Sequence, residues 1–258
     1  MPENKKIGLA LGAGAARGFA HVGILEVFEE EKIPVSVITG TSMGALIGGL
    51  YASGIALSFI KSYVKRFDIS RFLDFTLREG GIVKGRRIEE LLKIFTGNCS
   101  IEQLKIPFSC AAIDVTNGTV KNFMEGGLYE AIRASISIPG IFAPYEIDGV
   151  YYIDGGPLER IPIDACKALG AEFVIAVDVS WRGQDLPVPK NAIQSMQSAL
   201  SITGWCIAQE NQKKADIELA PDVFHINPFS SKEFDACVEA GRAAALAALP
   251  EIKEKLSL

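Results

Sequence analysis

The stretch VITGTSMGALIGG, residues 37–49, joins a β-branched run to a row of small residues through the pattern G-x-S-x-G. β-Branched residues favour a strand, and the small residues that follow the serine favour a helix. A strand, a tight turn and a helix are the parts of a nucleophile elbow, in which only very small neighbours allow the strained serine conformation. The pattern predicts that Ser42 is a nucleophile flanked by the elbow glycines Gly40 and Gly44. A structural serine in a glycine-rich loop is the alternative.

A second glycine-rich turn, LGAGAARG at residues 11–18, also joins a strand-like run to a helix-like one. It does not fit a dinucleotide fingerprint, because Arg17 stands where the third glycine is required and no acidic residue follows the next strand. It is not a P-loop either, since Gly-Lys-Ser/Thr is absent. A turn of backbone N–H groups at a helix start can serve as an oxyanion hole, although a turn without a ligand is also possible. The candidate donors are Gly12, Ala13, Gly14 and Ala15.

A serine nucleophile needs a base, and the chain contains only two histidines. His21 lies in the helix-like run GFAHVGILEVF and is expected to be a packed, structural residue. His225 lies between prolines late in the chain, on an expected loop. The order Ser42, Asp154, His225 would match the triad of α/β-hydrolases, so this triad stays open as an alternative.

Three aspartates follow apolar strand-like runs and could act directly on the serine. Asp154 is followed by Gly155 and Gly156, which leave its carboxylate accessible to a reacting group. Burial would raise the pKa of this carboxyl group and make it a better base. Asp114 and Asp178 are expected to cap turns or to serve the structure.

The composition predicts a globular protein without a nucleic-acid partner. The 258 residues are 48% hydrophobic and carry a net charge of −5, which provides a large core and no attraction for nucleic acid. The five cysteines form no CxxC pair, which predicts free, buried thiols and no metal site. The N-terminus lacks a signal-peptide pattern, and the weakly polar stretch Met43–Leu57 is too short to cross a bilayer. A cytoplasmic location is expected.

Strand-like and helix-like segments alternate, which favours a sheet with crossover helices in a single domain over residues 1–258. Asp148-Gly149 between apolar runs predicts a hairpin with a type I′ turn. The helical pattern of Leu57–Thr96 is interrupted by REGGIVKG, which fits either a cover over a site or ordinary surface helices. Strands are expected at Lys6–Leu11, Val35–Thr39, Phe108–Val115, Phe173–Val179 and Ile217–Leu219. Helices are expected at Phe19–Glu31, Met43–Ser53, Leu128–Ser135, Ile163–Leu169, Ala192–Ala208 and Phe234–Leu249.

These elements, in this order, resemble the patatin-like phospholipase family, in particular its small bacterial members, which are similar to the esterase domain of neuropathy target esterase. LALGAGAARGFAHVG matches the oxyanion loop, GTSMGALIGGLYASG the elbow and YIDGG the Asp-Gly-Gly motif. EGGIVKGRRIEELL and IRASISIPGIFAPYEIDGVYYIDGG extend the match, so the motif-bearing part is about residues 6–180. Ala13 departs from a glycine found in many members, but it keeps the backbone amide. The C-terminal strand and helices are expected to complete the fold.

The resemblance implies a three-layer α/β fold with a central, mainly parallel sheet flanked by helices. It also implies a dyad of Ser42 and Asp154 that needs no catalytic histidine, metal or organic cofactor. The expected activity is hydrolysis of carboxylic esters of phospholipids, lysophospholipids or other acyl lipids through an acyl-enzyme. The alternatives are the triad with His225 and a non-catalytic protein that binds a lipid or a partner on the same fold.

The acyl chain of such a substrate is expected to lie against Leu46, Ile141, Phe142 and the region Phe59–Phe95, although many of these residues also suit a core. Arg17 is expected to form a structural salt bridge, with ordering of the loop or contact with a lipid phosphate as alternatives. Peripheral contact with the inner face of the membrane is left open, as is the oligomeric state.

Overall fold

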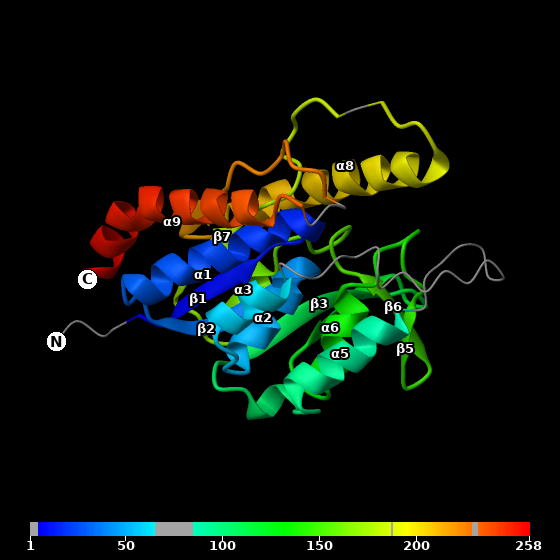
Figure 1. The fold of residues 1–258 in the computed structure, drawn as a ribbon, viewed down its shortest axis with the longest axis horizontal. Helices are drawn as coiled ribbons and strands as arrows, with labels where there is room; N and C mark the ends of the chain where they lie inside the picture. The colour runs from blue at the N-terminus through cyan, green and yellow to red at the C-terminus, as the bar shows by residue number, and fades with distance from the viewer. Residues whose placement is uncertain (1–4, 65–84, 187, 229–231) are drawn as a thin grey trace.

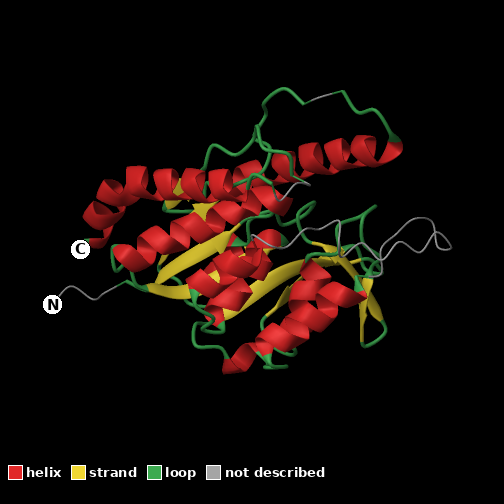
Figure 2. Ribbon diagram, in the orientation of Figure 1, coloured by secondary structure: helices red, strands yellow, loops and turns green. Residues whose placement is uncertain are grey.

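The computed structural model describes residues 5–64, 85–186, 188–228 and 232–258. Within these ranges eight strands form one sheet, and helices cover both of its faces (Figure 1 and Figure 2). The three-layer α/β architecture with a mainly parallel sheet is therefore confirmed. The strands are β1 (Ile7–Leu11), β2 (Val35–Thr41), β3 (Phe108–Asp114), β4 (Thr119–Phe123), β5 (Tyr145–Ile147), β6 (Val150–Asp154), β7 (Phe173–Val177) and β8 (Ile217–Leu219).

The strands follow the order β5-β6-β3-β2-β1-β7-β8, and β4 pairs with β3. The pairs from β3 through β2, β1 and β7 to β8 are parallel, whereas β4, β5 and β6 are joined by antiparallel pairs. All five residues of both β1 and β7 are buried. Central parallel strands are covered on both faces, which explains why IGLAL and FVIAV are nearly continuous apolar runs.

The register of β3 brings the ends of two distant strands together. β4 pairs with one edge of β3 over Cys110–Asp114. β2 and β6 pair with β3 residues that overlap this range, so both lie along the opposite edge. Along that edge Thr41 of β2 pairs with Ala111, and Asp154 of β6 pairs with the next residue, Ala112. Because β2 runs parallel to β3 and β6 runs antiparallel, their C-terminal ends meet there.

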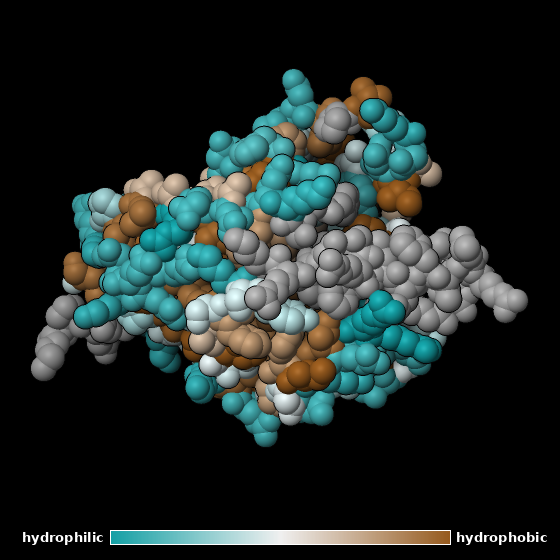
Figure 3. All heavy atoms as spheres, in the orientation of Figure 1, coloured by the Kyte–Doolittle hydropathy of each residue, from teal (hydrophilic) through white to brown (hydrophobic). Residues whose placement is uncertain are grey.

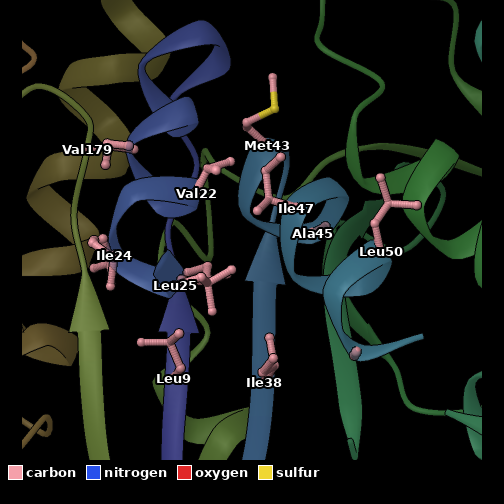
Figure 4. Close-up of a cluster of buried hydrophobic side chains, with 14 of the residues drawn as sticks. Leu9, Val22, Ile24, Leu25, Ile38, Met43, Ala45, Ile47, Leu50 and Val179 are labelled. Atoms are coloured by element: carbon pink, nitrogen blue, oxygen red, sulfur yellow. The ribbon is translucent and has the colours of Figure 1, made fainter. Parts of the chain in front are cut away.

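The helices are η1 (Ala15–Phe19), α1 (Ala20–Glu30), α2 (Met43–Ala52), α3 (Leu57–Val64), α5 (Arg86–Thr96), η2 (Ile101–Gln103), α6 (Leu128–Ser135), α7 (Ile163–Ala168), α8 (Ala192–Gln212) and α9 (Phe234–Leu256). The main core lies between the sheet and the layer that contains α1 and α2. Figure 4 shows Leu9 and Ile38 on neighbouring strands, together with Leu25 and Ile47 on the helices of this layer. A smaller cluster under α7 covers the other face.

Two features differ from the expected elements. β4 was not predicted, because TVKNF carries only a weak apolar alternation after the turn at residues 114–118. α9 continues beyond Leu249 through Pro250 to Leu256. Ile252 is fully buried and Lys253 forms an ion pair with Glu31 at 2.8 Å, so tertiary packing offsets the unfavourable proline.

The expected hairpin is confirmed. Asp148 and Gly149 have φ values of 50° and 79°, and positive φ at both central residues is what a type I′ turn requires. The interruption REGGIVKG lies outside the described residues except for Gly85. The prediction of buried thiols was wrong for Cys206, which is exposed on α8, and Cys99 is only partly buried. The single domain over residues 1–258 stays a prediction, supported by one sheet that draws strands from both halves of the chain.

Candidate active site

Ser42 occupies a strained turn between β2 and α2. Its φ and ψ are 57° and −119°, and only 3% of the residue is exposed. A Cβ atom on Gly44 would stand 2.1 Å from the Leu11 carbonyl oxygen, and one on Gly40 would stand 2.4 Å from the Gly44 carbonyl oxygen. Glycine at both positions therefore allows α2 to approach the strands closely. This geometry is that of a nucleophile elbow.

The main chain of the elbow is held by Ser135, which sequence reasoning did not single out. The Ser42 N–H donates to Ser135 Oγ at 2.9 Å, and the Ser135 hydroxyl donates to the Ala111 carbonyl oxygen at 2.7 Å. Ala111 is the last β3 residue that pairs with β2, and the next residue, Ala112, pairs with β6. The only sequence signal for Ser135 is its place in the run IRASISIPG, because a serine near the end of a helix is unremarkable by itself.

Asp154 lies beside Ser42 at the end of β6 and is 5% exposed. Burial raises the pKa of this carboxyl group to about 6, against the opposing effects of hydrogen bonds from the Ser42 side chain and the Gly156 N–H. The Gly156 N–H donates to Asp154 Oδ1 at 2.8 Å. A Cβ atom on Gly155 would stand 2.6 Å from the Ala111 carbonyl oxygen, so the first glycine is required by packing.

The glycine-rich loop offers fewer free amides than its sequence suggests. The Gly12 N–H donates to the Val177 carbonyl oxygen and the Ala13 N–H to the Arg160 carbonyl oxygen, both at 2.9 Å. In the described part of the chain, the N–H groups of Gly14 and Ala15 have no such acceptor. Ala15 has a positive φ of 48° and lies against the same cavities as Ser42. The candidate oxyanion donors are thus reduced to Gly14 and Ala15.

The two histidines lie apart from this arrangement. His21 is fully buried and bonds the Gly12 carbonyl oxygen through Nε2 at 2.8 Å, as a packed structural residue should. Burial lowers its pKa to about 4, so the imidazole is neutral and Nε2 is the donor. The His225 side chain is 68% exposed and lies 3.7 Å from Asp222. The structure does not place His225 against the cavities that Ser42 lines.

The other two strand-end aspartates have structural partners. Asp114 Oδ1 accepts from the Thr116 N–H at 2.8 Å and caps the turn that leads to β4. Asp178 is buried against the Arg160 guanidinium and accepts a hydrogen bond from Gln212 Nε2 at 2.7 Å. Both therefore serve the roles that the sequence predicted.

Arg17 departs from its prediction. Among the described residues its guanidinium binds the carbonyl oxygens of Ile226 and Phe224, at 2.9 and 2.7 Å, and no carboxylate lies within ion-pair distance. It also lies over the Phe224 ring, 4.8 Å from the centroid. The expected salt bridge is thus replaced by contacts that attach the glycine-rich loop to the segment before α9.

Two cavities of opposite character meet at Ser42. A cavity of about 160 Å³ has a partly polar wall that includes Asp154, Arg17, Ser180 and Gln197. A second cavity of about 80 Å³ has an almost entirely apolar wall. Ser42, Ala15 and Ile138 line both cavities. The apolar cavity is lined by Ala15, Phe19, Ser42, Met43, Leu46, Leu50, Tyr63, Ile88, Leu91, Leu92, Phe95, Ile136, Ile138, Ile141 and Phe142.

The expected acyl-chain residues Leu46, Ile141, Phe142 and Phe95 all line the apolar cavity, whereas Phe59 does not and is half exposed. Within the described ranges, no cluster of three or more His, Cys, Asp or Glu side chains is arranged to hold a metal ion. The helices of the same ranges include none with the length and apolar character needed to cross a membrane.

A serine elbow and a buried aspartate at the meeting ends of two strands place the protein among α/β proteins with an esterase-like site geometry. The model of the patatin-like phospholipases matches residues 9–167. The chain belongs to the patatin-like phospholipase family.

Relatives in sequence agree with this assignment, and a solved structure has a similar fold. An uncharacterized NTE family protein of Mycobacterium tuberculosis is 39% identical over 181 residues, which cover 69% of this chain and 50% of the relative. Lysophospholipase NTE1 of Saccharomyces cerevisiae is 36% identical over 192 residues, 72% of this chain and 11% of that protein. The chain thus corresponds to half or less of these relatives. VipD from Legionella pneumophila is similar in fold, with a TM-score of 0.71 at 13% identity, over 97% of this chain and 67% of VipD.

Proposed function

We propose that the protein hydrolyses carboxylic esters of acyl lipids through a dyad of Ser42 and Asp154. The observation that carries the proposal is the position of Ser42 on a strained elbow that lines the same cavity as the buried Asp154 carboxyl group, whose pKa burial raises to about 6. A carboxylate with this pKa is largely ionised near pH 7, yet it is a stronger base than an ordinary aspartate. Ser42 also stands where an apolar and a polar cavity meet, which suits a lipid ester.

In the proposed reaction, Ser42 Oγ attacks the acyl carbonyl carbon while Asp154 accepts the hydroxyl proton. The Gly14 and Ala15 amides stabilise the oxyanion, a contribution of roughly 3 kcal/mol for a donor of this kind. The first N–H groups of α2 have no acceptor within the helix, and their partial positive charge also stabilises the oxyanion. Asp154 then protonates the leaving alcohol and activates the water molecule that releases the acyl group.

The two cavities suggest how a substrate would lie. The acyl chain would occupy the apolar cavity, and the leaving alcohol and water would occupy the polar one beside Gln197 and Ser180. The name of the yeast relative, lysophospholipase, favours a phospholipid or lysophospholipid among the acyl lipids. A triad with His225 is disfavoured by the exposure of that side chain. A non-catalytic binding protein is disfavoured by the presence of both members of the dyad.

The test combines labelling by a fluorophosphonate probe with turnover of p-nitrophenyl butyrate. Wild-type protein is expected to be labelled and active, Ser42→Ala to lose both properties, and Asp154→Asn to lose turnover. His225→Ala serves as the control and is expected to retain both. Turnover by folded Ser42→Ala would refute the dyad, and inactivity of folded His225→Ala would replace it with the triad.

We also propose a peripheral contact with a lipid surface through α8. Residues 191–209 contain no charged side chain, although 22% of the chain is charged. Ile193 at the start of α8 is 52% exposed, and Ile202 and Ile207 are also exposed. Figure 3 shows hydrophobic side chains at the upper right, where Figure 1 places α8 and the loop before it. The inner side of the helix lines the polar cavity through Gln197 and other residues.

A further inference from the structure

The apolar cavity extends along one side of α2. It begins at Ser42, which caps α2, and continues past Leu46 to Leu50 on the same side of that helix. Figure 4 shows Met43 on the first turn of α2 and Leu50 close to its end. Eight residues of α-helix separate Ser42 from Leu50, which corresponds to about 12 Å along the axis. A chain attached to Ser42 would therefore pass Leu46 first and reach Leu50 last.

The cavity is also small. Its volume of about 80 Å³ is roughly half that of a dry apolar cavity of about 150 Å³ that binds one molecule of benzene, which has six carbons. The cavity can therefore bury about three alkyl carbons without rearrangement. Together with the carbonyl carbon at Ser42, this corresponds to an acyl group of about four carbons.

A second wall of the cavity is built from α5 and includes the aromatic rings of Phe95 and Tyr63. Ile88, Leu92 and Phe95 repeat along one face of α5 and line the cavity. The Phe95 ring packs edge-on against Tyr63, with centroids 4.3 Å apart, and lies 5.6 Å from the Phe59 ring. Phe95 is held on its outer side by α3, which limits its ability to move out of the way of a longer chain.

We propose that this cavity selects the acyl group by length, with a preference for acyl groups of about four carbons, and that Phe95 and Leu46 set the limit. The inference rests on the proposed function, because it assigns the acyl group to the cavity beside Ser42. Each methylene that enters a dry apolar site contributes roughly a fourfold gain in binding. A methylene that finds no space contributes nothing or causes a clash.

The experiment measures kcat/KM for p-nitrophenyl esters from acetate to palmitate. For wild-type protein, kcat/KM is expected to rise about fourfold per added methylene until the cavity is filled, at about four carbons, and then to level off or fall. Phe95→Ala removes part of the wall and should move the optimum to chains about two to four carbons longer. Leu46→Trp fills the cavity one turn from Ser42 and should move the optimum to acetate.

Ile94→Ala is the matched control, because Ile94 is the neighbour of Phe95 on α5 but is 72% exposed and lines neither cavity that Ser42 reaches. Its chain-length profile should equal that of wild-type protein. A cooperative urea transition shows that Phe95→Ala and Leu46→Trp are folded. An unchanged profile in both active variants, or a wild-type rate that still rises at palmitate, would overturn the inference alone. Absence of all ester turnover in wild-type protein would overturn the proposed function as well.

Discussion

Replacement of Asp154 by asparagine should stabilise the protein near neutral pH while it abolishes the proposed activity. Burial raises the pKa of this carboxyl group from 3.8 to about 6. Between these two pH values the folded state therefore holds a proton that the unfolded state releases. The stability contributed by this group is therefore complete below pH 3.8 and is lost as the pH rises through about 6. A difference of about two pH units corresponds to roughly 3 kcal/mol.

Asparagine is nearly isosteric with aspartate, and its side-chain oxygen can still accept the Gly156 N–H. It does not ionise, so it avoids the cost of burying a carboxylate. The free energy of unfolding of Asp154→Asn, minus that of wild-type protein, should increase from pH 4.5 to pH 8 and approach about 3 kcal/mol at the upper end. Urea denaturation at half-unit intervals of pH, extrapolated to zero denaturant, measures this difference.

Asp114→Asn, on the neighbouring strand, is a control for which the expected change in stability has the opposite sign. Hydrogen bonds from the Asn117 side chain and from the N–H groups of Asn117 and Thr116 hold the pKa of Asp114 below its usual value. Its contribution to stability is present above the unfolded-state pKa and is lost in acid, so Asp114→Asn should be less stable than wild-type protein at pH 8. A stability difference for Asp154→Asn that stays constant from pH 4.5 to pH 8 would refute the reasoning.

Three further results are expected. If ionised Asp154 is the base, kcat/KM for a p-nitrophenyl ester should rise about tenfold per pH unit below pH 6 and level off above it. A value of kcat/KM that does not change from pH 5 to pH 8 would contradict this role. Gly44→Ala should lower the free energy of unfolding, measured by urea denaturation, by more than about 2 kcal/mol, because the added Cβ would lie 2.1 Å from the Leu11 carbonyl oxygen. A variant as stable as wild-type protein would show that the elbow tolerates a methyl group. Ile193→Asp should reduce flotation with phosphatidylcholine vesicles, whereas Ile94→Asp should not, and equal flotation of both variants would exclude α8 as the contact surface.

Individual parts of the site could be predicted from the sequence because each depends on local chemistry. Gly40 and Gly44 indicate a turn that only small residues allow, and the apolar run before Asp154 indicates a strand end. The meeting of Ser42 with Asp154 could not be predicted in this way. It depends on the register of β3, where Ala111 and Ala112 pair with residues of two different strands, and two alanines carry no signal of that pairing.

The glycine-rich loop shows the same division between local and tertiary information. Its sequence predicts a turn of exposed amides at a helix start. Which amides stay free is decided by distant carbonyl groups, since Val177 and Arg160 accept the hydrogen bonds of Gly12 and Ala13. Ser135 was missed for a related reason, because its hydroxyl is useful only after α6 has packed beside the gap between β2 and β6.

The proposal of Asp154 as the base rests on the way in which the gap between β2 and β6 is filled. The head-on approach of β2 and β6 buries Asp154 between their ends, and that burial moves its pKa toward neutral pH. Burial has the opposite effect on His21, whose pKa of about 4 and whose bond to Gly12 leave it a neutral donor. A histidine in the same setting is therefore a poor proton acceptor, whereas a carboxylate becomes a better one. Burial of the carboxyl group thus favours an aspartate as the proposed partner of Ser42, whereas His21 holds the loop that carries the proposed oxyanion donors.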